Sequence, residues 1–403
     1  MAEWVEKSLG EVTSYIAKGI PPQYTDKYSE NVIYVLNQKC NRDYSVSYEQ
    51  ARLHDLSKKK IAEEKMLKSG DVLINSTGEG TAGRVAQLWN IPSQTTVDGH
   101  MIILRPTSEV DTLYYGYAIK AQQFMIESLA EGSTGQTEIN RKRLQEEITI
   151  SYPKDKKKQH SIAKILEEID KKIEVNNQIN RNLSEQAQAI YEFWFVSFEK
   201  FGGVVPLDWD NGVLGDIAEI KTTSFKPDKE PSVLVEHYSI PALDEKHFPV
   251  FELAEGIKSN KYLLNKNSVM ISKLNPDTKR IWRPLCLSDK PVCSTEFIVF
   301  EAKNKKNKDF IFSILDSDKF SNHLCSHVTG STGSRQRAVP KATLDFKVLI
   351  PPQGLIEQFC SIVTPIYDLI GVNEIENQRL SKLRDSLLLK LMSGELDVSN
   401  LDI

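Results

Sequence analysis

Two stretches of the chain repeat one pattern of apolar residues and asparagines. In the first stretch these residues recur in alternating steps of four and three, and the pattern includes Asn176 and Asn180. Adding 197 to each number gives a second stretch with the same spacing, in which the asparagines return as Asn373 and Asn377. This spacing is typical of a helix that packs lengthwise on another helix. The expected seam residues are Ile169, Ile173, Asn176, Asn180, Leu183 and Ile190 in the first helix and Ile366, Ile370, Asn373, Asn377, Leu380 and Leu387 in the second.

The two helices are expected to pack on each other as an antiparallel coiled coil. Each helix has an apolar stripe that is too narrow to be buried in a globular core by itself. Repeated halves are often related by a two-fold axis, and such an axis makes the two helices antiparallel. The asparagines then meet near the middle of the coil, where a polar pair penalises slipped registers at a cost in stability.

The repeat extends to the segments that precede the helices. The tetrapeptide Gly-Ser-Thr-Gly occurs at residues 132–135 and again at 330–333, and a strand-like run ending in proline precedes each long helix. Matching segments keep the same order in both halves, which indicates duplicated domains. The sequence therefore predicts a globular domain at 1–156, a spacer helix at 157–200, a second globular domain at 201–352 and a second spacer helix at 353–403.

Each globular half mixes short strand-like runs with helical patches. The runs are broken by glycine, proline, asparagine and serine, and their pairing order does not follow from the sequence. The expected fold class is α+β, with two similar mixed α/β domains separated by a long antiparallel two-helix coiled coil in a pseudo-two-fold repeat. Pro365 removes a backbone donor from the second helix and Gly371 weakens it, so a kink or break is expected near Thr364.

The composition is that of a soluble globular protein. Of the 403 residues, 40% are hydrophobic and 26% are charged, and this length suits two to four domains. An uninterrupted apolar run of about 18 residues is missing, as is a secretory signal, so we expect no membrane association. Five cysteines without CxxC spacing fit a reducing cytoplasm. The net charge of -4 leaves a local DNA-binding face open.

A glycine-rich segment, Gly78–Gly83, has the GxGxxG spacing of a dinucleotide-binding loop. Such a loop requires a helix directly after it, because the amides at the helix N-terminus meet the pyrophosphate. Here Arg84–Trp89 alternates like a strand, and the matching segment of the second half, Leu274–Arg280, has no glycine. A hairpin loop is the favoured interpretation.

Motifs for catalysis and metal binding are missing or incomplete. His323, Cys325 and His327 are potential ligands, but no second cluster with zinc spacing completes a set of four, so we expect no metal site. The sequence contains no adenine methyltransferase tetrapeptide, no Walker loop and no GxSxG. We therefore expect no catalytic residue and no cofactor in this chain.

Basic residues near small or aromatic residues are the candidates for DNA contact. Each Gly-Ser-Thr-Gly is followed by basic residues, at positions 141–143 and at 335 and 337. Exposed amides with nearby cations can hold a phosphate, and a tight turn with solvated cations explains the pattern equally well. Between Lys273 and Arg283, cations alternate with Asn275 and Trp282, as contacts to base edges favour. The candidate DNA-binding residues are Arg84, Lys273, Asn275, Lys279, Arg280, Arg335 and Arg337.

Taken together, these features resemble the specificity subunit of a type I restriction-modification enzyme. The resemblance covers essentially the whole chain and depends on the duplicated order of domain and helix and on several short motifs. These are Gly-Ser-Thr-Gly before each proline, Gln-His-Ser-Ile-Ala-Lys-Ile-Leu at 159–166, Asp-Lys-Lys-Ile at 170–173, Tyr-Glu-Phe-Trp-Phe at 191–195 and Leu-Met-Ser-Gly at 391–394. The resemblance implies two target-recognition domains, each reading one half of a bipartite DNA sequence, and helices that set the gap and dock two methyltransferase subunits.

The resemblance also implies the partners and the division of labour. Two methyltransferase subunits would methylate adenine with S-adenosylmethionine, and restriction subunits would translocate and cleave double-stranded DNA with ATP and Mg. This chain would be a non-catalytic, cytoplasmic subunit. Two alternatives stay open: a scaffold or inhibitor that binds the same subunits without reading DNA, and a stand-alone DNA enzyme, which the missing motifs disfavour.

Overall fold

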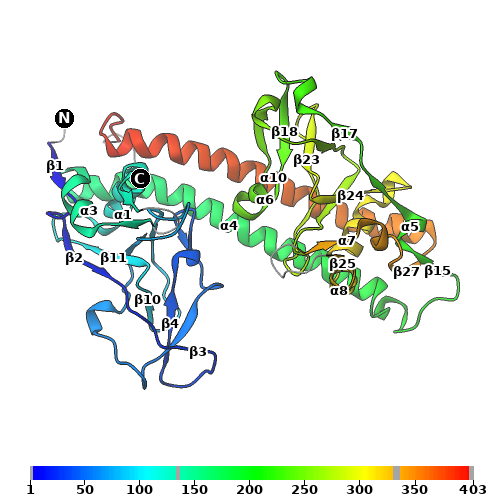
Figure 1. Ribbon diagram of the computed structural model, residues 1–403, viewed down its shortest axis with the longest axis horizontal. Coiled ribbons are helices and arrows are strands. Elements are labelled where there is room, and N and C mark those ends of the chain that lie inside the picture. Colours follow the sequence, from blue (N-terminus) through cyan, green and yellow to red (C-terminus); the bar gives the residue numbers. More distant parts are fainter. Residues whose placement is uncertain (1–2, 133–136, 330–335, 399–403) are drawn as a thin grey trace. The chain divides into compact units, whose positions relative to one another are not determined.

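The computed structural model of the chain describes residues 3–132, 137–329 and 336–398. It divides into two compact units, which are described separately here. Unit 1 comprises Met1–Lys172 together with Leu380–Ile403, and unit 2 comprises Ile173–Arg379. Each unit contains one globular domain and part of each of two long helices, α4 (Lys156–Phe195) and α10 (Gln353–Met392) (Figure 1).

Two four-stranded sheets form the globular domain of unit 1. The first is antiparallel with strand order β2-β11-β8-β9, and the second has the order β10-β4-β7-β3 with a parallel pair between β10 and β4. The first sheet consists of β2 (Thr13–Lys18), β11 (Met101–Pro106), β8 (Val72–Asn75) and β9 (Val85–Gln87). The second consists of β10 (Thr95–Val97), β4 (Val32–Leu36), β7 (Arg52–Asp55) and β3 (Tyr24–Thr25).

Shorter strands and helices complete unit 1. Helix α1 packs on the first sheet, and the side chain of Asp111 caps its N-terminus by accepting hydrogen bonds from the amides of Leu113 and Tyr114, both at 3.0 Å. The paired strands are β1 (Trp4–Ser8) with β14 (Thr149–Pro153), β5 (Asn41–Arg42) with β6 (Ser45–Val46), and β12 (Ala130–Glu131) with β13 (Glu138–Ile139). The helices are α1 (Thr112–Ala121), α2 (Gln123–Ser128) and α3 (Arg141–Glu147).

Unit 2 repeats this architecture. Its first sheet has the order β16-β24-β21-β22, and its second has the order β17-β20-β23-β18-β19 with a parallel pair between β18 and β23. The first sheet consists of β16 (Ala218–Lys221), β24 (Phe297–Ala302), β21 (Ser268–Ser272) and β22 (Ile281–Trp282). The second consists of β17 (Ser224–Phe225), β20 (Lys261–Leu263), β23 (Pro291–Ser294), β18 (Leu234–Tyr238) and β19 (Val250–Leu253).

Shorter strands and helices complete unit 2, and most of them match elements of unit 1. The paired strands are β15 (Asp210–Val213) with β27 (Lys347–Ile350), and β25 (Val328–Thr329) with β26 (Arg337–Ala338). The helices are α5 (Leu214–Ile217), α6 (Ile240–Lys246), α7 (Lys308–Asp316), α8 (Asp318–Ser326) and α9 (Pro340–Thr343). The expectation of two similar mixed α/β domains is confirmed.

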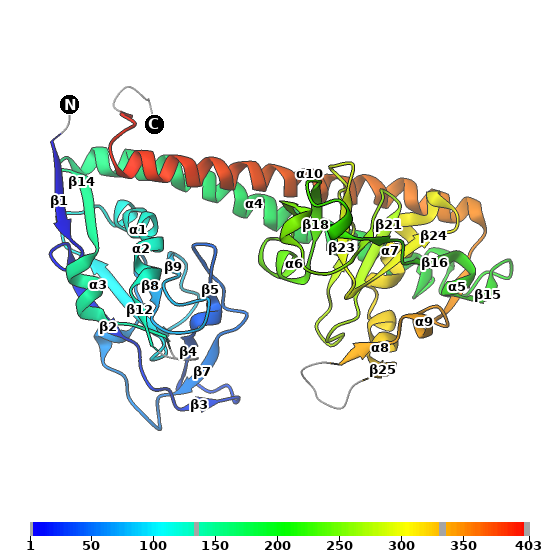
Figure 2. The same ribbon diagram turned by 45° about the horizontal axis from the view of Figure 1, so that its top comes forward.

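The long helices α4 and α10 are antiparallel, as the repeat predicted. In unit 2 they lie side by side (Figure 2), and Asn176 donates to Oδ1 of Asn377 at 2.9 Å while Asn373 donates to Oδ1 of Asn180 at 2.7 Å. In unit 1, Nη1 of Arg384 on α10 donates to Oδ1 of Asp170 on α4 at 2.8 Å. Residue numbers thus rise along one helix as they fall along the other.

Each globular domain packs on both helices. The core of unit 1 includes Ile162, Ala163 and Leu166 from α4 together with Leu388, Leu391 and Met392 from α10. The core of unit 2 includes Ala187, Tyr191 and Trp194 from α4 together with Ile356, Phe359 and Val363 from α10. Burying a large apolar side chain contributes about 1.5–3 kcal/mol, so several such residues hold each domain firmly on its helices.

Of the kink or break expected near Thr364, the break does not occur. Helix α10 is continuous from Gln353 to Met392 and includes Pro365. The buried neighbours Val363 and Tyr367 belong to the core of unit 2, so tertiary packing holds the helix across the missing hydrogen bond. Gly371 has a packing role, because a Cβ atom there would come within 2.8 Å of Cδ2 of Leu285.

Helix α10 is more apolar than the lack of an uninterrupted apolar run suggested. By length and composition alone it is able to cross a membrane. A single such helix is weak evidence for a membrane span. Here its buried residues Ile356, Phe359 and Val363 lie in the core of unit 2.

Candidate nucleic-acid interface

The glycine-rich segment of unit 1 is a hairpin loop. Strands β8 and β9 pair antiparallel on either side of it, and the amide of Gly83 donates to the carbonyl of Asn75 at 2.8 Å. A strand follows the loop where a dinucleotide site needs a helix. Gly83 has φ of 89°, and a Cβ atom there would lie 2.7 Å from Cα of Glu127. The glycines therefore serve the turn and its packing, and the hairpin interpretation is confirmed.

Arg84 and Arg280 occupy equivalent positions in the two units. The carbonyl of Arg84 accepts a hydrogen bond from the amide of Asn75 at 3.0 Å, and the carbonyl of Arg280 accepts one from the amide of Ser272 at 2.8 Å. Asn75 and Ser272 end the matching strands β8 and β21. Both arginines therefore lie at the end of the same loop in the duplicated fold.

The surroundings of these two arginines differ. Nη2 of Arg84 donates to the carbonyl of Gly80 at 3.3 Å. Nε and Nη2 of Arg280 form a bidentate pair with the carboxylate of Asp244 at 2.7 and 2.9 Å, and only 17% of the Arg280 side chain is exposed. Contact between Arg280 and DNA therefore requires the arginine to exchange its carboxylate partner for a phosphate or a base.

Lys279 is also paired within its own domain. Its Nζ lies 2.5 Å from Oδ1 of Asp316. Burial raises the pKa of the Asp316 carboxyl group, and the neighbouring Lys279 acts in the opposite direction. The ion pair thus offsets part of the cost of burying the carboxylate.

Three other candidates of the second domain meet at one corner. The carbonyl of Lys273 accepts from the amide of Ala338 at 2.8 Å, and the amide of Asn275 donates to the carbonyl of Gln336 at 2.9 Å. These bonds join the loop after β21 to the strand that carries Arg337, whose side chain is 44% exposed and donates to Glu296 at 2.9 and 3.1 Å. The sequence suggested Lys273 and Asn275 as part of one basic cluster and Arg337 as part of another, and the fold brings the two segments together.

Asn275 has an unusual backbone and side chain. Its φ is 47°, in the left-handed region that asparagine tolerates better than most residues. Its buried Oδ1 atom has no hydrogen-bond partner among the described residues. An unsatisfied buried acceptor costs about 1–3 kcal/mol, so this side chain is held at a cost in stability.

Arg335 lies outside the described residues, as do residues 133–136 and 330–334 of the two Gly-Ser-Thr-Gly segments. Their flanking strands are described. β12 pairs with β13 and β25 pairs with β26, antiparallel in both cases.

The candidate metal residues lie on and just after α8. Nε2 of His323 lies 2.9 Å from the carbonyl oxygen of Ala342, and Nδ1 of His327 lies 2.9 Å from the carbonyl oxygen of His323. These contacts occupy ring nitrogens that a metal would need. Within residues 3–132, 137–329 and 336–398, His, Cys, Asp and Glu form no cluster of three suited to a metal ion.

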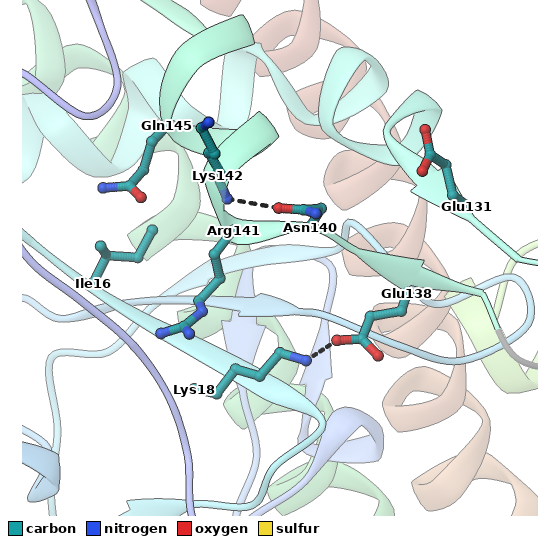
Figure 3. A pocket seen from close by; sticks show the side chains of 8 residues that line it. All are labelled: Ile16, Lys18, Glu131, Glu138, Asn140, Arg141, Lys142 and Gln145. Carbon is teal, nitrogen blue, oxygen red and sulfur yellow. Dashed lines mark hydrogen bonds and ion pairs between the residues drawn. The ribbon is translucent and has the colours of Figure 1, made fainter.

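Sequence reasoning missed a basic hollow in unit 1 that lies next to β13. It has a volume of about 660 Å³ and is lined by Ile16, Lys18, Glu131, Glu138, Asn140, Arg141, Lys142 and Gln145 (Figure 3). Strand β2 supplies Lys18 and the start of α3 supplies Arg141, which are far apart in the sequence. The basic run at 141–143 was a sequence-level signal, but its neighbour Lys18 was not predictable.

Several large apolar side chains of the long helices are exposed. In unit 2 these are Val175, Ile179 and Phe193 on α4 and Ile362, Leu369 and Val372 on α10. In unit 1, Leu383 and Leu389 of α10 are exposed. Exposed apolar groups on helices whose other faces are buried are typical of surfaces that bind another protein.

Comparisons with known proteins agree over nearly the whole chain. A family model described as "Type I restriction modification DNA specificity domain" matches residues 1–185 and 206–384. The chain is 25% identical to the type I restriction enzyme MjaIX specificity subunit of Methanocaldococcus jannaschii, over 99% of this chain and 95% of that protein. It is 21% identical to the HindI specificity subunit of Haemophilus influenzae, over 98% of this chain and 100% of that protein.

One solved structure has the same fold. The S subunit of a type I restriction-modification system from M. genitalium superposes with a TM-score of 0.55 and 18% sequence identity, and the match covers 99% of this chain and 97% of that one.

Proposed function

Because the chain belongs to the family of type I restriction-modification DNA specificity subunits, we propose that each of its globular domains reads one half of a bipartite DNA target. The observation that carries this proposal is the duplicated fold, in which the strand order of the first sheet recurs in both units while the surroundings of equivalent residues such as Arg84 and Arg280 differ. A shared scaffold with divergent surfaces suits two readers of two different sequences. The reading domains are residues 1–156 and 201–352, and the spacer helices are 157–200 and 353–403.

The helices act as the ruler between the two half-sites in this proposal. A helix of 40 residues is about 60 Å long at 1.5 Å per residue, which exceeds one DNA turn of about 34 Å. The hydrogen-bonded asparagines of the seam favour one register, because a slip would separate them. A fixed register gives a fixed gap between the half-sites.

The helices also dock two methyltransferase subunits in this proposal. The exposed apolar residues Ile362, Leu369 and Val372 on α10 and Val175 and Ile179 on α4 offer a surface for such partners. The partners supply S-adenosylmethionine chemistry, and restriction subunits supply ATP- and Mg-dependent translocation and cleavage. The present chain contributes recognition and no catalytic group, and it works in the cytoplasm, where its five free cysteines stay reduced.

The test is methylation by a reconstituted complex. The chain and its methyltransferase subunits are co-expressed, and methylated adenines are mapped across the host DNA. We expect one bipartite, asymmetric motif, and exchange of residues 1–156 for the matching domain of another specificity subunit should change one half-site only. Methylation without a sequence motif would support the scaffold alternative, and methyl transfer by the isolated chain would support the stand-alone enzyme.

A further inference from the structure

The basic hollow of unit 1 has a counterpart in unit 2. The second hollow has a volume of about 710 Å³ and lies between β16 and α9. Strand register shows that the two hollows occupy the same place in the duplicated fold. In unit 1, Ile16 of β2 pairs with Leu104, which pairs with Val72. In unit 2, Ile220 of β16 pairs in the same way with Phe300, which pairs with Val269. β2 and β16 are edge strands of matching sheets.

The linings of the two hollows differ at most equivalent positions. Ile16 corresponds to Ile220, and Lys142 corresponds to Lys341, each at the second position of its helix. The other equivalent pairs are Lys18 with Thr222, Asn140 with Val339, Arg141 with Pro340, and Gln145 with Leu344. At these four positions the side chains of the first hollow are charged or amide groups, and those of the second are apolar except for Thr222. Equivalent positions with different side chains are expected of surfaces that bind different ligands.

Arg141 is the unmatched charge of the first hollow. It extends from the start of α3 toward β2, alongside Lys18 (Figure 3). Lys18 forms an ion pair with Glu138, and Glu131 forms one with Arg143 on the neighbouring turn. Among the described residues Arg141 has no carboxylate partner, although two carboxylates line the same hollow. The nearest acids are thus already engaged by other cations.

The two cations also act on each other. Burial lowers the pKa of Lys18, and the positive charge of Arg141 lowers it further. Such like-charge repulsion in a partly enclosed site is relieved when an anion binds between the cations. Arg141 presents a fork of N–H donors that fits a phosphate, and the amide groups of Asn140 and Gln145 add neutral donors beside it.

We propose that the hollow of unit 1 holds a backbone phosphate of the target DNA, with Arg141 as the main ligand and Lys18 as the second cation. This inference depends on the proposed function, since it assumes that the first domain contacts DNA. The equivalent hollow of unit 2 is lined by Lys303, Lys341 and Glu219, and its lining contains no arginine among the described residues. The first hollow therefore offers a guanidinium fork for a phosphate that the second does not.

The test uses the complex of the full chain with its methyltransferase subunits. Arg141→Gln and the charge-matched control Lys27→Gln, an exposed lysine of the same domain, are compared on a target duplex and on duplexes with one half-site altered. We expect Arg141→Gln to weaken DNA binding about tenfold on all these duplexes. We also expect a less steep plot of the logarithm of the association constant against the logarithm of the salt concentration, with a slope smaller in magnitude by about 0.9. Lys27→Gln should leave both quantities unchanged, and assembly of the complex should be intact for both variants.

Methylphosphonate substitution identifies the phosphate. Each phosphate of the first half-site is replaced in turn by a neutral methylphosphonate, and affinity is measured for the wild-type and Arg141→Gln complexes. We expect one position at which the substitution weakens the wild type but not the variant. The inference is overturned if the affinity losses from methylphosphonate and from Arg141→Gln add at every position. It is also overturned if Arg141→Gln weakens binding to one half-site sequence only, or if Lys27→Gln weakens binding equally.

Two further measurements separate this inference from its alternatives. If inorganic phosphate binds the wild-type chain while Arg141→Gln leaves DNA affinity unchanged, the hollow binds free phosphate and the inference is wrong. If the wild-type complex shows no sequence preference, the proposed function itself fails. A wild type that recognises its target together with an unaffected Arg141→Gln variant refutes only the phosphate site.

Discussion

Replacing Asn176 with alanine should lower the free energy of unfolding of unit 2 by about 2 kcal/mol. Asn176 is 1% exposed, and its Nδ2 donates to Oε2 of Glu376 at 2.7 Å and to Oδ1 of Asn377 at 2.9 Å. A hydrogen bond to a charged group contributes about 1.5–3 kcal/mol and one to a neutral amide about 0.5–1.5 kcal/mol. The higher helix propensity of alanine, worth about 0.6 kcal/mol, offsets part of this loss.

The assay is urea unfolding followed by the helical circular dichroism signal. Gln178→Ala is the matched control, because exposed Gln178 lies on the same helix and donates only to Glu174 at 3.0 Å. The control should change the free energy by less than about 0.5 kcal/mol. If Asn176→Ala is as mild as the control, or stabilises the protein, the seam asparagines do not hold the helix pair in register and the reasoning is refuted.

Three further predictions concern other contacts. Burial alone would lower the pKa of His247, but its 2.7 Å hydrogen bond to Glu374 outweighs burial and raises the pKa. This contact therefore stabilises unit 2 fully below pH about 6.5 and loses strength as the pH rises through the raised pKa. The free energy of unfolding should fall from pH 6 to 8, and Glu374→Gln should flatten that dependence. Gly394→Ala should lower the thermal midpoint, because Gly394 has φ of 77° and a Cβ atom would lie 2.6 Å from Trp4, at a cost of about 1–3 kcal/mol; an unchanged midpoint would contradict this. Arg280→Ala should weaken recognition of one half-site only, as measured by methylation of altered targets, and an equal loss on all DNA sequences would make it a phosphate contact.

The helix pair was predictable because its signal is local. Heptad spacing and recurring asparagines fix which face of each helix is buried, and duplication of the chain supplies the antiparallel direction. The loop at residues 76–83 and its counterpart at 274–280 were matched from the sequence, and both lie between paired antiparallel strands. The order of strands in the sheets was not predictable, since it depends on contacts between distant segments.

Local rules failed where tertiary contacts override them. Pro365 indicated a break, yet buried neighbours on both sides keep α10 continuous. Composition and spacing identified Arg280 as a candidate DNA contact but gave no sign of Asp244, which the fold places against it. Lys18 joins Arg141 only because β2 and α3 border one hollow. Ion pairs between segments far apart in sequence leave no periodic pattern from which to predict them.

The most direct test of the account lengthens the ruler. Seven residues, one heptad, are inserted at matching positions of both α4 and α10, so that the seam pattern is kept while each helix grows by about 10 Å. Methylated adenines are then mapped for the variant and the wild-type complex. The account predicts unchanged half-site sequences separated by a gap that is wider by up to about three base pairs, at 3.4 Å per step. An unchanged gap with full methylation activity would contradict it.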